Sequence, residues 1–147
     1  MERIVRYQGA IIADDGKILL IQHREHGTGR AYWLLPGGGR EDDESEAECV
    51  RREMQEETTL DVIVERLLLD EAAIPGGIYQ RLKTFLCRPV AGTAAPGYEP
   101  EPEAAEYAIV AVGWWDLYDE STWHLSIIAD PITSTVLRRI RTALVSS

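Results

Sequence analysis

Residues 38–60 read GGREDDESEAECVRREMQEETTL, and the second half of this stretch decides how the fold and the chemistry are interpreted. It predicts a helix in which Glu53, Glu56 and Glu57 share one face, because residues three and four apart are neighbours on a helix. Three carboxylates in one turn repel each other, and at a helix C-terminus the macrodipole disfavours each by about 0.3–1 kcal/mol. Acids kept where stability disfavours them indicate a functional site. As hard oxygen ligands they suit Mg²⁺ or Mn²⁺.

Two features precede this helix. Ser45 and Glu48 form an S-x-x-E capping box, which predicts that the helix begins at Glu46. Further upstream, Gly37, Gly38 and Gly39 provide backbone that can adopt positive φ and approach a ligand closely. A glycine-rich turn of this kind can present backbone groups to a metal or a phosphate.

The acidic residues belong to a longer pattern with fixed spacing. Gly38 is followed after five residues by Glu44, and Glu44 after seven residues by the run REMQEETTL at 52–60. This arrangement resembles the Nudix box of the Nudix hydrolase (MutT-like) family, G-x5-E-x7-R-E-U-x-E-E-x-G-U, where U is a bulky apolar residue. The positions that match are Gly38, Glu44, Arg52, Glu53, Met54, Glu56, Glu57 and Leu60. The box covers residues 38–60, and the order of elements along the rest of the chain is compatible with the family's fold.

One position departs from the family pattern. Thr59 stands where the family has a glycine, which usually ends the helix in a left-handed conformation. A β-branched residue with the same dihedrals would be strained by roughly 1–2 kcal/mol. We therefore expect the turn after the helix to be rebuilt.

The resemblance implies a role for each matching acid. Glu53, Glu56 and Glu57 would hold one or more Mg²⁺ (or Mn²⁺) ions, helped by the carbonyl of Gly37. In the family, such ions clamp the diphosphate and activate the attacking water, as bridging metals do in general.

The remaining catalytic roles are supporting ones. Arg52 would orient a neighbouring glutamate through charge-assisted hydrogen bonds, and Glu44 would be partly structural. The general base would be Glu53 or Glu56, or a glutamate of the 99–106 loop, as in several family members. The loop candidates are Glu99, Glu101, Glu103 and Glu106, of which we favour Glu103 and Glu106.

Substrate contacts are predicted outside the helix. Arg24, Arg81 and Lys83 are candidates for binding phosphates. Arg81 and Lys83 share one face of a strand by the two-residue period, but they are equally expected to be solvated charges. Gly38 is a candidate for a close backbone contact with the substrate. Tyr79 is a candidate for stacking on a base, against the commoner alternative of packing. His23 lacks a ligand-like spacing and is expected to be a surface or hydrogen-bonded residue.

The pattern of apolar residues and turn signals predicts an α/β layered domain, with a mixed β-sheet between helices as in the Nudix-type α/β/α sandwich. Residues 3–13 and 17–24 read as a hairpin around Asp14-Asp15-Gly16, and Pro36-Gly37-Gly38-Gly39 would stop a short strand at 32–35. Further strands are expected at 61–69, 79–88 and 107–115. A loop is expected at 89–105, and a final helix after Asp130-Pro131. We expect one domain spanning 1–147.

Composition limits the class of partner. The chain has 147 residues and a net charge of −10, which disfavours binding to DNA or RNA polymers. Cys49 and Cys87 favour two buried free thiols over a disulfide, which fits a reducing cytoplasm. We see no signal peptide and no apolar run long enough to span a membrane.

The resemblance implies Mg²⁺-dependent hydrolysis of a phosphoanhydride bond in a nucleoside diphosphate linked to another moiety X: a (d)NTP, a dinucleotide polyphosphate or a nucleotide sugar. Homodimers are common in the family, which leaves monomer and homodimer as the assemblies to test. The alternative on the same fold is a non-catalytic sensor of a nucleotide metabolite. A third reading is an interaction protein with an acidic helix, whose stability metals would not change.

Overall fold

The computed structural model describes residues 4–73, 75, 78–98 and 107–146. Along the chain its elements are β1 (Val5–Ile11), β2 (Lys17–Glu25), β3 (Ala31–Leu34), β4 (Gly37–Gly38), α1 (Glu46–Thr58), β5 (Asp61–Ala72), β6 (Arg81–Ala91), β7 (Tyr107–Asp116), the 3₁₀ helix η2 (Glu120–Thr122), α2 (Leu125–Ile128) and α3 (Pro131–Ser146).

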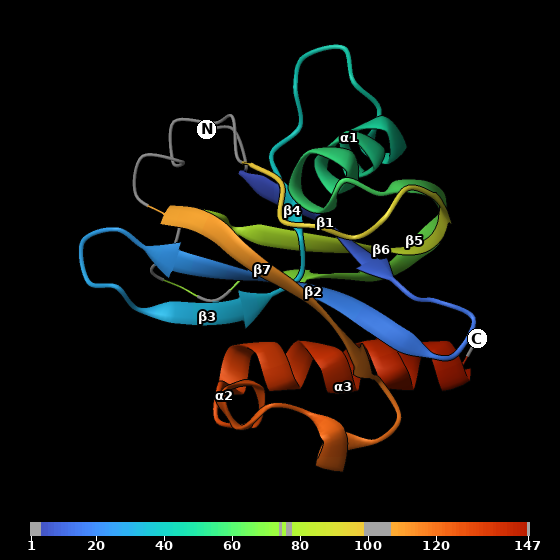
Figure 1. Ribbon diagram of the computed structural model, residues 1–147. Coiled ribbons are helices and arrows are strands. Elements are labelled where there is room, and N and C mark those ends of the chain that lie inside the picture. The colour runs from blue at the N-terminus through green and yellow to red at the C-terminus, as the bar shows by residue number, and fades with distance from the viewer. Residues whose placement is uncertain (1–3, 74, 76–77, 99–106, 147) are drawn as a thin grey trace.

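The strands form two sheets that make up the middle layer of the fold. The first has the order β4-β1-β6-β5 and is mixed, because β1 and β6 run parallel while the other neighbours are antiparallel. The second has the order β3-β2-β7 and is antiparallel. Helix α1 covers one side of this layer, and α3 with α2 covers the other (Figure 1). The predicted α/β/α architecture is confirmed, with the middle layer divided between two sheets.

The predicted hairpin at 3–13 and 17–24 is wrong beyond its turn. The turn forms, with Gly16 at φ 83° and its N–H donating to the carbonyl of Ala13. Among the described residues of the two segments, however, a single bridge, Ile12 to Ile18, joins them. The strands then enter different sheets, β1 between β4 and β6 and β2 between β3 and β7. Residues 18–21 are all fully buried, as in strands that are covered on both faces, whereas an exposed hairpin would alternate.

The glycine run also behaves differently from the prediction. Gly37 and Gly38 do not simply stop the preceding strand, since they form β4, which pairs with Tyr7 and Gln8 of β1. None of the three glycines at 37–39 has positive φ. Gly37 instead allows β4 to lie close to β1, because a Cβ at this position would lie 2.4 Å from the carbonyl oxygen of Tyr7.

The core consists of two clusters, one toward each helical layer. Strand β2 contributes to both, since Leu19 packs toward α1 while Ile18 and Leu20 pack toward α3, as the two-residue period of a strand requires. The cluster on the α1 side contains Tyr7, Ile11, Leu19, Cys49, Val50, Met54, Leu60, Val62, Phe85 and Cys87. The cluster on the α3 side contains Ala10, Ile18, Leu20, Leu35, Leu117, Trp123, Ile127, Leu137 and Ile140.

Helix α1 begins as predicted and ends differently. Ser45 is the N-cap, and both hydrogen bonds of the capping box with Glu48 are present. Thr59 is the C-cap at φ 62° and ψ 10°, so the turn keeps the left-handed conformation that we expected a threonine to abandon. Its N–H donates to Gln55, and its Oγ1 donates to the carbonyl of Thr93 at 2.6 Å, which offsets the strain.

Several smaller expectations are also decided. Cys49 and Cys87 are buried free thiols, as predicted. Strand β6 extends to Ala91, into the stretch expected to be a loop, and η2 and α2 are additional short helices. Among the residues that the structure describes, no helix is long and apolar enough to cross a membrane.

Candidate active site on helix α1

Arg52 lies at the centre of an acidic cluster on α1. Its Nε and Nη2 donate to the two carboxylate oxygens of Glu44 at 2.7 and 3.0 Å, the bidentate arrangement that makes an arginine–carboxylate pair strong. Its Nη1 donates to Glu53 at 2.9 Å and contacts both oxygens of Glu56 at 3.3 Å. One guanidinium therefore serves three of the acids predicted from the sequence.

Glu44 holds the arginine in place from outside the helix. Its own carboxylate accepts the N–H of Glu41, and Arg52 also donates to the carbonyl of Gly39 at 3.0 Å. The hydrogen bonds from Arg52 lower the pKa of the Glu44 carboxyl, and those to Glu44 raise the pKa of the Arg52 guanidinium. Both groups thus stay charged, and the loop before α1 is fixed to the helix.

Glu53 and Glu57 face strand β4 and are fully buried. The N–H of Gly37 donates to Glu57 at 2.7 Å, so the backbone of the glycine run binds a carboxylate of the helix. A Cβ at Gly38 would lie 2.6 Å from Oε2 of Glu53, so only a glycine lets this acid lie against the strand. The glycines and the acids of the motif therefore fit each other across the helix–strand contact.

The donor set suits a hard divalent cation. Three carboxylates lie within the last two turns of one helix, and the Glu56 side chain keeps 19% of its surface exposed. Among the described residues no three acidic, histidine or cysteine side chains already converge as metal ligands. Arg52 donates to Glu53, and the N–H of Gly37 donates to Glu57. The carboxylates of Glu53, Glu56 and Glu57 fit Mg²⁺ or Mn²⁺ in their chemistry.

The whole-chain comparison agrees with this local geometry. A family model described as the NUDIX domain matches residues 5–130. The chain belongs to the NUDIX family.

Individual NUDIX proteins share between about a fifth and a third of their residues with this chain. A MutT-like protein of Streptomyces ambofaciens is 33% identical over 94 residues, which are 60% of this chain and 53% of that protein, so the match spans about half of the relative. The crystal structure of a NUDIX hydrolase from Nitrosomonas europaea has a TM-score of 0.70 at 21% identity, covering 96% of this chain and 72% of that one. An ADP-ribose pyrophosphatase from Streptococcus suis has a TM-score of 0.66 at 24% identity, covering 99% and 92%. These structures establish the NUDIX fold.

Of the predicted phosphate-binding side chains, Arg81 and Lys83 lie two residues apart on β6 of this NUDIX domain, and Arg24 lies in the other sheet. Lys83 donates to Glu46 at 2.7 Å, and Arg81 pairs with Asp70. Arg24 is exposed on β2, on the other sheet. The structure thus brings together the acids of the box, and it does not bring the three cations to one place.

An aromatic group around His23 was missed from the sequence. His23 is 3% exposed, its ring stacks on Tyr107 at 4.1 Å between centroids, and it meets the edge of Tyr32 at 5.6 Å. A surface position, one of the two alternatives expected, is wrong because His23 is buried. Its Nε2 is buried and has no hydrogen-bond partner among the described residues. Burial, with a smaller contribution from Arg6, lowers the pKa of His23 to about 4. The period of β2 was the available signal, because His23 shares a face with Leu19 and Ile21.

Two further predictions have different outcomes. Tyr79 lies beside Arg6, whose guanidinium carbon is 5.8 Å from the ring centroid, so its ring is occupied by a cation in this structure. The loop candidates for the general base, Glu99, Glu101, Glu103 and Glu106, lie outside the described residues.

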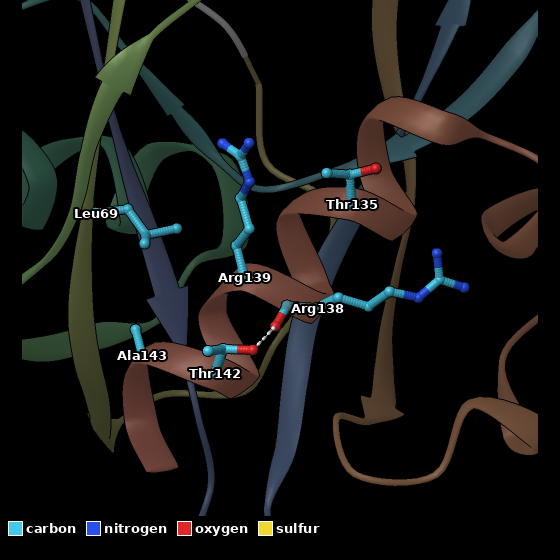
Figure 2. A pocket seen from close by; sticks show the side chains of 6 residues that line it. All are labelled: Leu69, Thr135, Arg138, Arg139, Thr142 and Ala143. Atoms are coloured by element: carbon cyan, nitrogen blue, oxygen red, sulfur yellow. Dashed lines mark hydrogen bonds between the residues drawn. The ribbon is translucent and has the colours of Figure 1, made fainter. Parts of the chain in front are cut away.

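A separate hollow of about 410 Å³ lies between α3 and β5. Leu69, Thr135, Arg138, Arg139, Thr142 and Ala143 line it (Figure 2). The described residues of its wall include no carboxylate, and α3 lies on the opposite side of the sheets from α1 (Figure 1). Because the chemistry of the NUDIX motif lies on α1, we do not place the active site in this hollow.

Proposed function

We propose that this chain is a pyrophosphohydrolase that cuts a phosphoanhydride bond in a nucleoside diphosphate linked to a moiety X, with Mg²⁺ or Mn²⁺ as cofactor. The observation that carries the proposal is the acidic cluster of α1, in which Glu53, Glu56 and Glu57 share one helix end and Arg52 contacts two of them. Membership of the NUDIX family supports the same reaction class.

The overall charge supports a small substrate over a nucleic acid polymer. A net charge of −10 repels polyanions, whereas a short diphosphate can be screened by a cation at the site. Substrates of the type (d)NTP, dinucleotide polyphosphate or nucleotide sugar all contain the required anhydride bond. Arg24, Arg81, Lys83, Tyr79 and the backbone of Gly38 remain our candidates for binding them.

Each acidic residue has a role in this proposal. Glu53, Glu56 and Glu57 would hold the cation with the carbonyl of Gly37, and Glu56 is the partly exposed member of the three. When bound, the divalent cation supplies charge neutralisation at the diphosphate and a water of lowered pKa. Arg52, anchored by Glu44, would keep Glu53 and Glu56 charged and oriented while ligands enter.

A general base completes the proposal. Glu53 and Glu56 are candidates from α1, and Glu103 and Glu106 are the candidates that we favour from the loop before β7. A carboxylate suits this task when its surroundings raise its pKa toward the working pH.

The test is product formation from a panel of (d)NTPs, dinucleotide polyphosphates and nucleotide sugars, with Mg²⁺ and with Mn²⁺. The wild type is compared with Glu56→Gln and Glu57→Gln, and Glu65→Gln is the matched control, since Glu65 is an exposed glutamate of β5 paired with Arg88. We expect metal-dependent turnover that falls by about 100-fold or more in both α1 variants, because each removes a proposed metal ligand and losing even a supporting residue of a metal site costs about 10–100-fold. The control is expected to keep wild-type turnover.

The other outcomes separate the alternatives. If the chain binds nucleotides but turns none of them over, the result would favour the nucleotide sensor over the enzyme. Absence of turnover, of binding and of any metal effect on melting would leave an acidic helix without a ligand.

A further inference from the structure

A short stretch after β6 covers the C-terminal end of α1. We call residues 93–98 the cap segment. Three of its backbone N–H groups donate to the helix: Ala95 to the carbonyl of Thr58 at 3.0 Å, Gly97 to that of Glu57 at 2.9 Å, and Tyr98 to that of Glu56 at 3.1 Å. Figure 1 shows this stretch, in yellow, running beside α1.

The cap segment satisfies a need that the helix sequence leaves open. The last carbonyls of a helix have no partners within it and carry the negative end of the dipole, which a lysine or arginine usually offsets. Helix α1 has no basic residue in its last turn, where Glu56 and Glu57 lie. Backbone N–H groups stabilise this end without placing a side-chain cation that would compete with a metal for the carboxylates.

The fit between the two segments is close and directional. A Cβ at Gly97 would lie 1.7 Å from the carbonyl oxygen of Glu56, so any other residue must push the cap segment off the helix. Thr59 donates its hydroxyl to the carbonyl of Thr93, which ties the left-handed residue at the helix end to the first residue of the segment. Ala94 packs against the core cluster that contains Cys49, Val50 and Met54 of α1.

We infer that Gly97 and Thr59 are positioning residues for the cation site. The contacts of Gly97 fix the backbone of Glu56 and Glu57, and Thr59 anchors the segment that makes those contacts, so the directions of both carboxylates depend on the cap segment. This inference rests on the proposed function, because it concerns the binding of a divalent cation to these acids. According to this inference, Gly97 and Thr59 increase the affinity for the metal although neither has a carboxylate to bind it.

The test measures binding of Mn²⁺ alone by isothermal titration calorimetry, so that it does not depend on activity. Gly97→Ala is compared with Gly27→Ala, a glycine-to-alanine change where a Cβ would meet no atom within 4 Å. We expect Gly97→Ala to bind Mn²⁺ about tenfold more weakly, as supporting residues of metal sites commonly show, and Gly27→Ala to bind as the wild type does. Ile140→Val changes a core residue of α3, on the other side of the sheets, and shows whether a general loss of stability by itself weakens Mn²⁺ binding.

A second pair covers the case in which Gly97→Ala does not fold. Thr59→Val removes the hydroxyl that reaches Thr93 and keeps the shape of the side chain, whereas Thr59→Ser keeps the hydroxyl. We expect weaker Mn²⁺ binding in Thr59→Val and wild-type binding in Thr59→Ser.

The outcomes distinguish this inference from the proposed function. Wild-type Mn²⁺ affinity in folded Gly97→Ala and in Thr59→Val would overturn the inference and leave the proposed function intact. Equal weakening in Gly27→Ala or Ile140→Val would also overturn it, since the effect would then follow stability. Failure of the wild type itself to bind Mn²⁺ or Mg²⁺ would overturn both.

Discussion

The two helical layers carry opposite kinds of charge cluster. On α1 one arginine, Arg52, serves Glu44, Glu53 and Glu56, and Glu53 is fully buried. Near α3 one carboxylate, Glu120, serves two arginines, Arg138 and Arg141, at the surface. The first cluster has more acid than base and the second more base than acid.

The difference shows which property separates a site from a surface contact. Both clusters contain short, well-directed ion pairs, so geometry alone does not distinguish them. The α1 cluster contains a fully buried carboxylate, Glu53, and its carboxylates outnumber its one arginine. The Glu120 cluster is solvated and satisfied, and exposed pairs of this kind contribute little to stability. Burial and charge imbalance, together, indicate the functional cluster.

The largest effect that separates the clusters is expected from Arg52→Met. Removing the guanidinium leaves Glu53 charged and buried without its cation, which should lower the free energy of unfolding by about 3–5 kcal/mol. Urea denaturation at pH 7 measures this change. Arg138→Met, the matched removal from the exposed cluster, should produce a much smaller loss, and similar losses in the two variants would contradict the comparison.

A smaller effect is expected at His23, a buried group outside the acidic cluster of α1. Its pKa of about 4 in the folded chain lies below the ordinary 6.5, so the unfolded chain binds a proton first as pH falls. The contribution of His23 to the free energy of unfolding should therefore be constant above pH 6.5 and decline by roughly 3 kcal/mol as pH falls toward 4. His23→Phe keeps an aromatic ring against Tyr107 and should remove this decline from a pH series of urea denaturations. An unchanged slope in the variant would show that other groups cause it.

The smallest effect is expected at Glu120, in the exposed cluster. Hydrogen bonds from Arg138 and then Arg141 lower the pKa of this carboxyl to about 2 from its ordinary 4.5. The ion pairs of Glu120 with the two arginines therefore stabilise the fold above pH 4.5, and this contribution is lost as pH falls from 4.5 through 2. In the same pH series, Glu120→Gln should differ slightly from the wild type at neutral pH and converge with it near pH 2. The difference should shrink in high salt, because exposed charges are screened, and persistence there would indicate a buried interaction instead.

The parts of the fold that depend on nearby residues could be predicted from the sequence. Ser45 and Glu48 lie three residues apart and define the start of α1 by themselves. The spacing of Glu53, Glu56 and Glu57 likewise fixes a common face of one helix. For these elements the physical cause is contained within a single turn of the chain.

Other parts depend on segments that are distant in sequence. The hairpin of β1 and β2 was predicted from a real turn, but β1 pairs instead with β4 and β6, which no local pattern encodes. Thr59 keeps its left-handed conformation because the carbonyl of Thr93 accepts its hydroxyl bond, a partner 34 positions away. His23 was expected to be a surface or hydrogen-bonded residue because it lacks a ligand-like spacing, whereas its burial depends on Tyr107, a residue 84 positions away.

The parallel pairing of β1 with β6 has a consequence for synthesis of the chain. Gln8 and Thr84, neighbours in the sheet, are separated by 76 positions, so β1 leaves the ribosome long before its partner exists. Strand β1 can pair early with β4, and β2 with β3, but the second edge of β1 stays open until β6 emerges and that of β2 until β7 emerges. Non-local pairing of this kind slows folding and exposes strands to aggregation meanwhile. The two sheets of this protein can therefore be completed only after the last strand, β7, has been made.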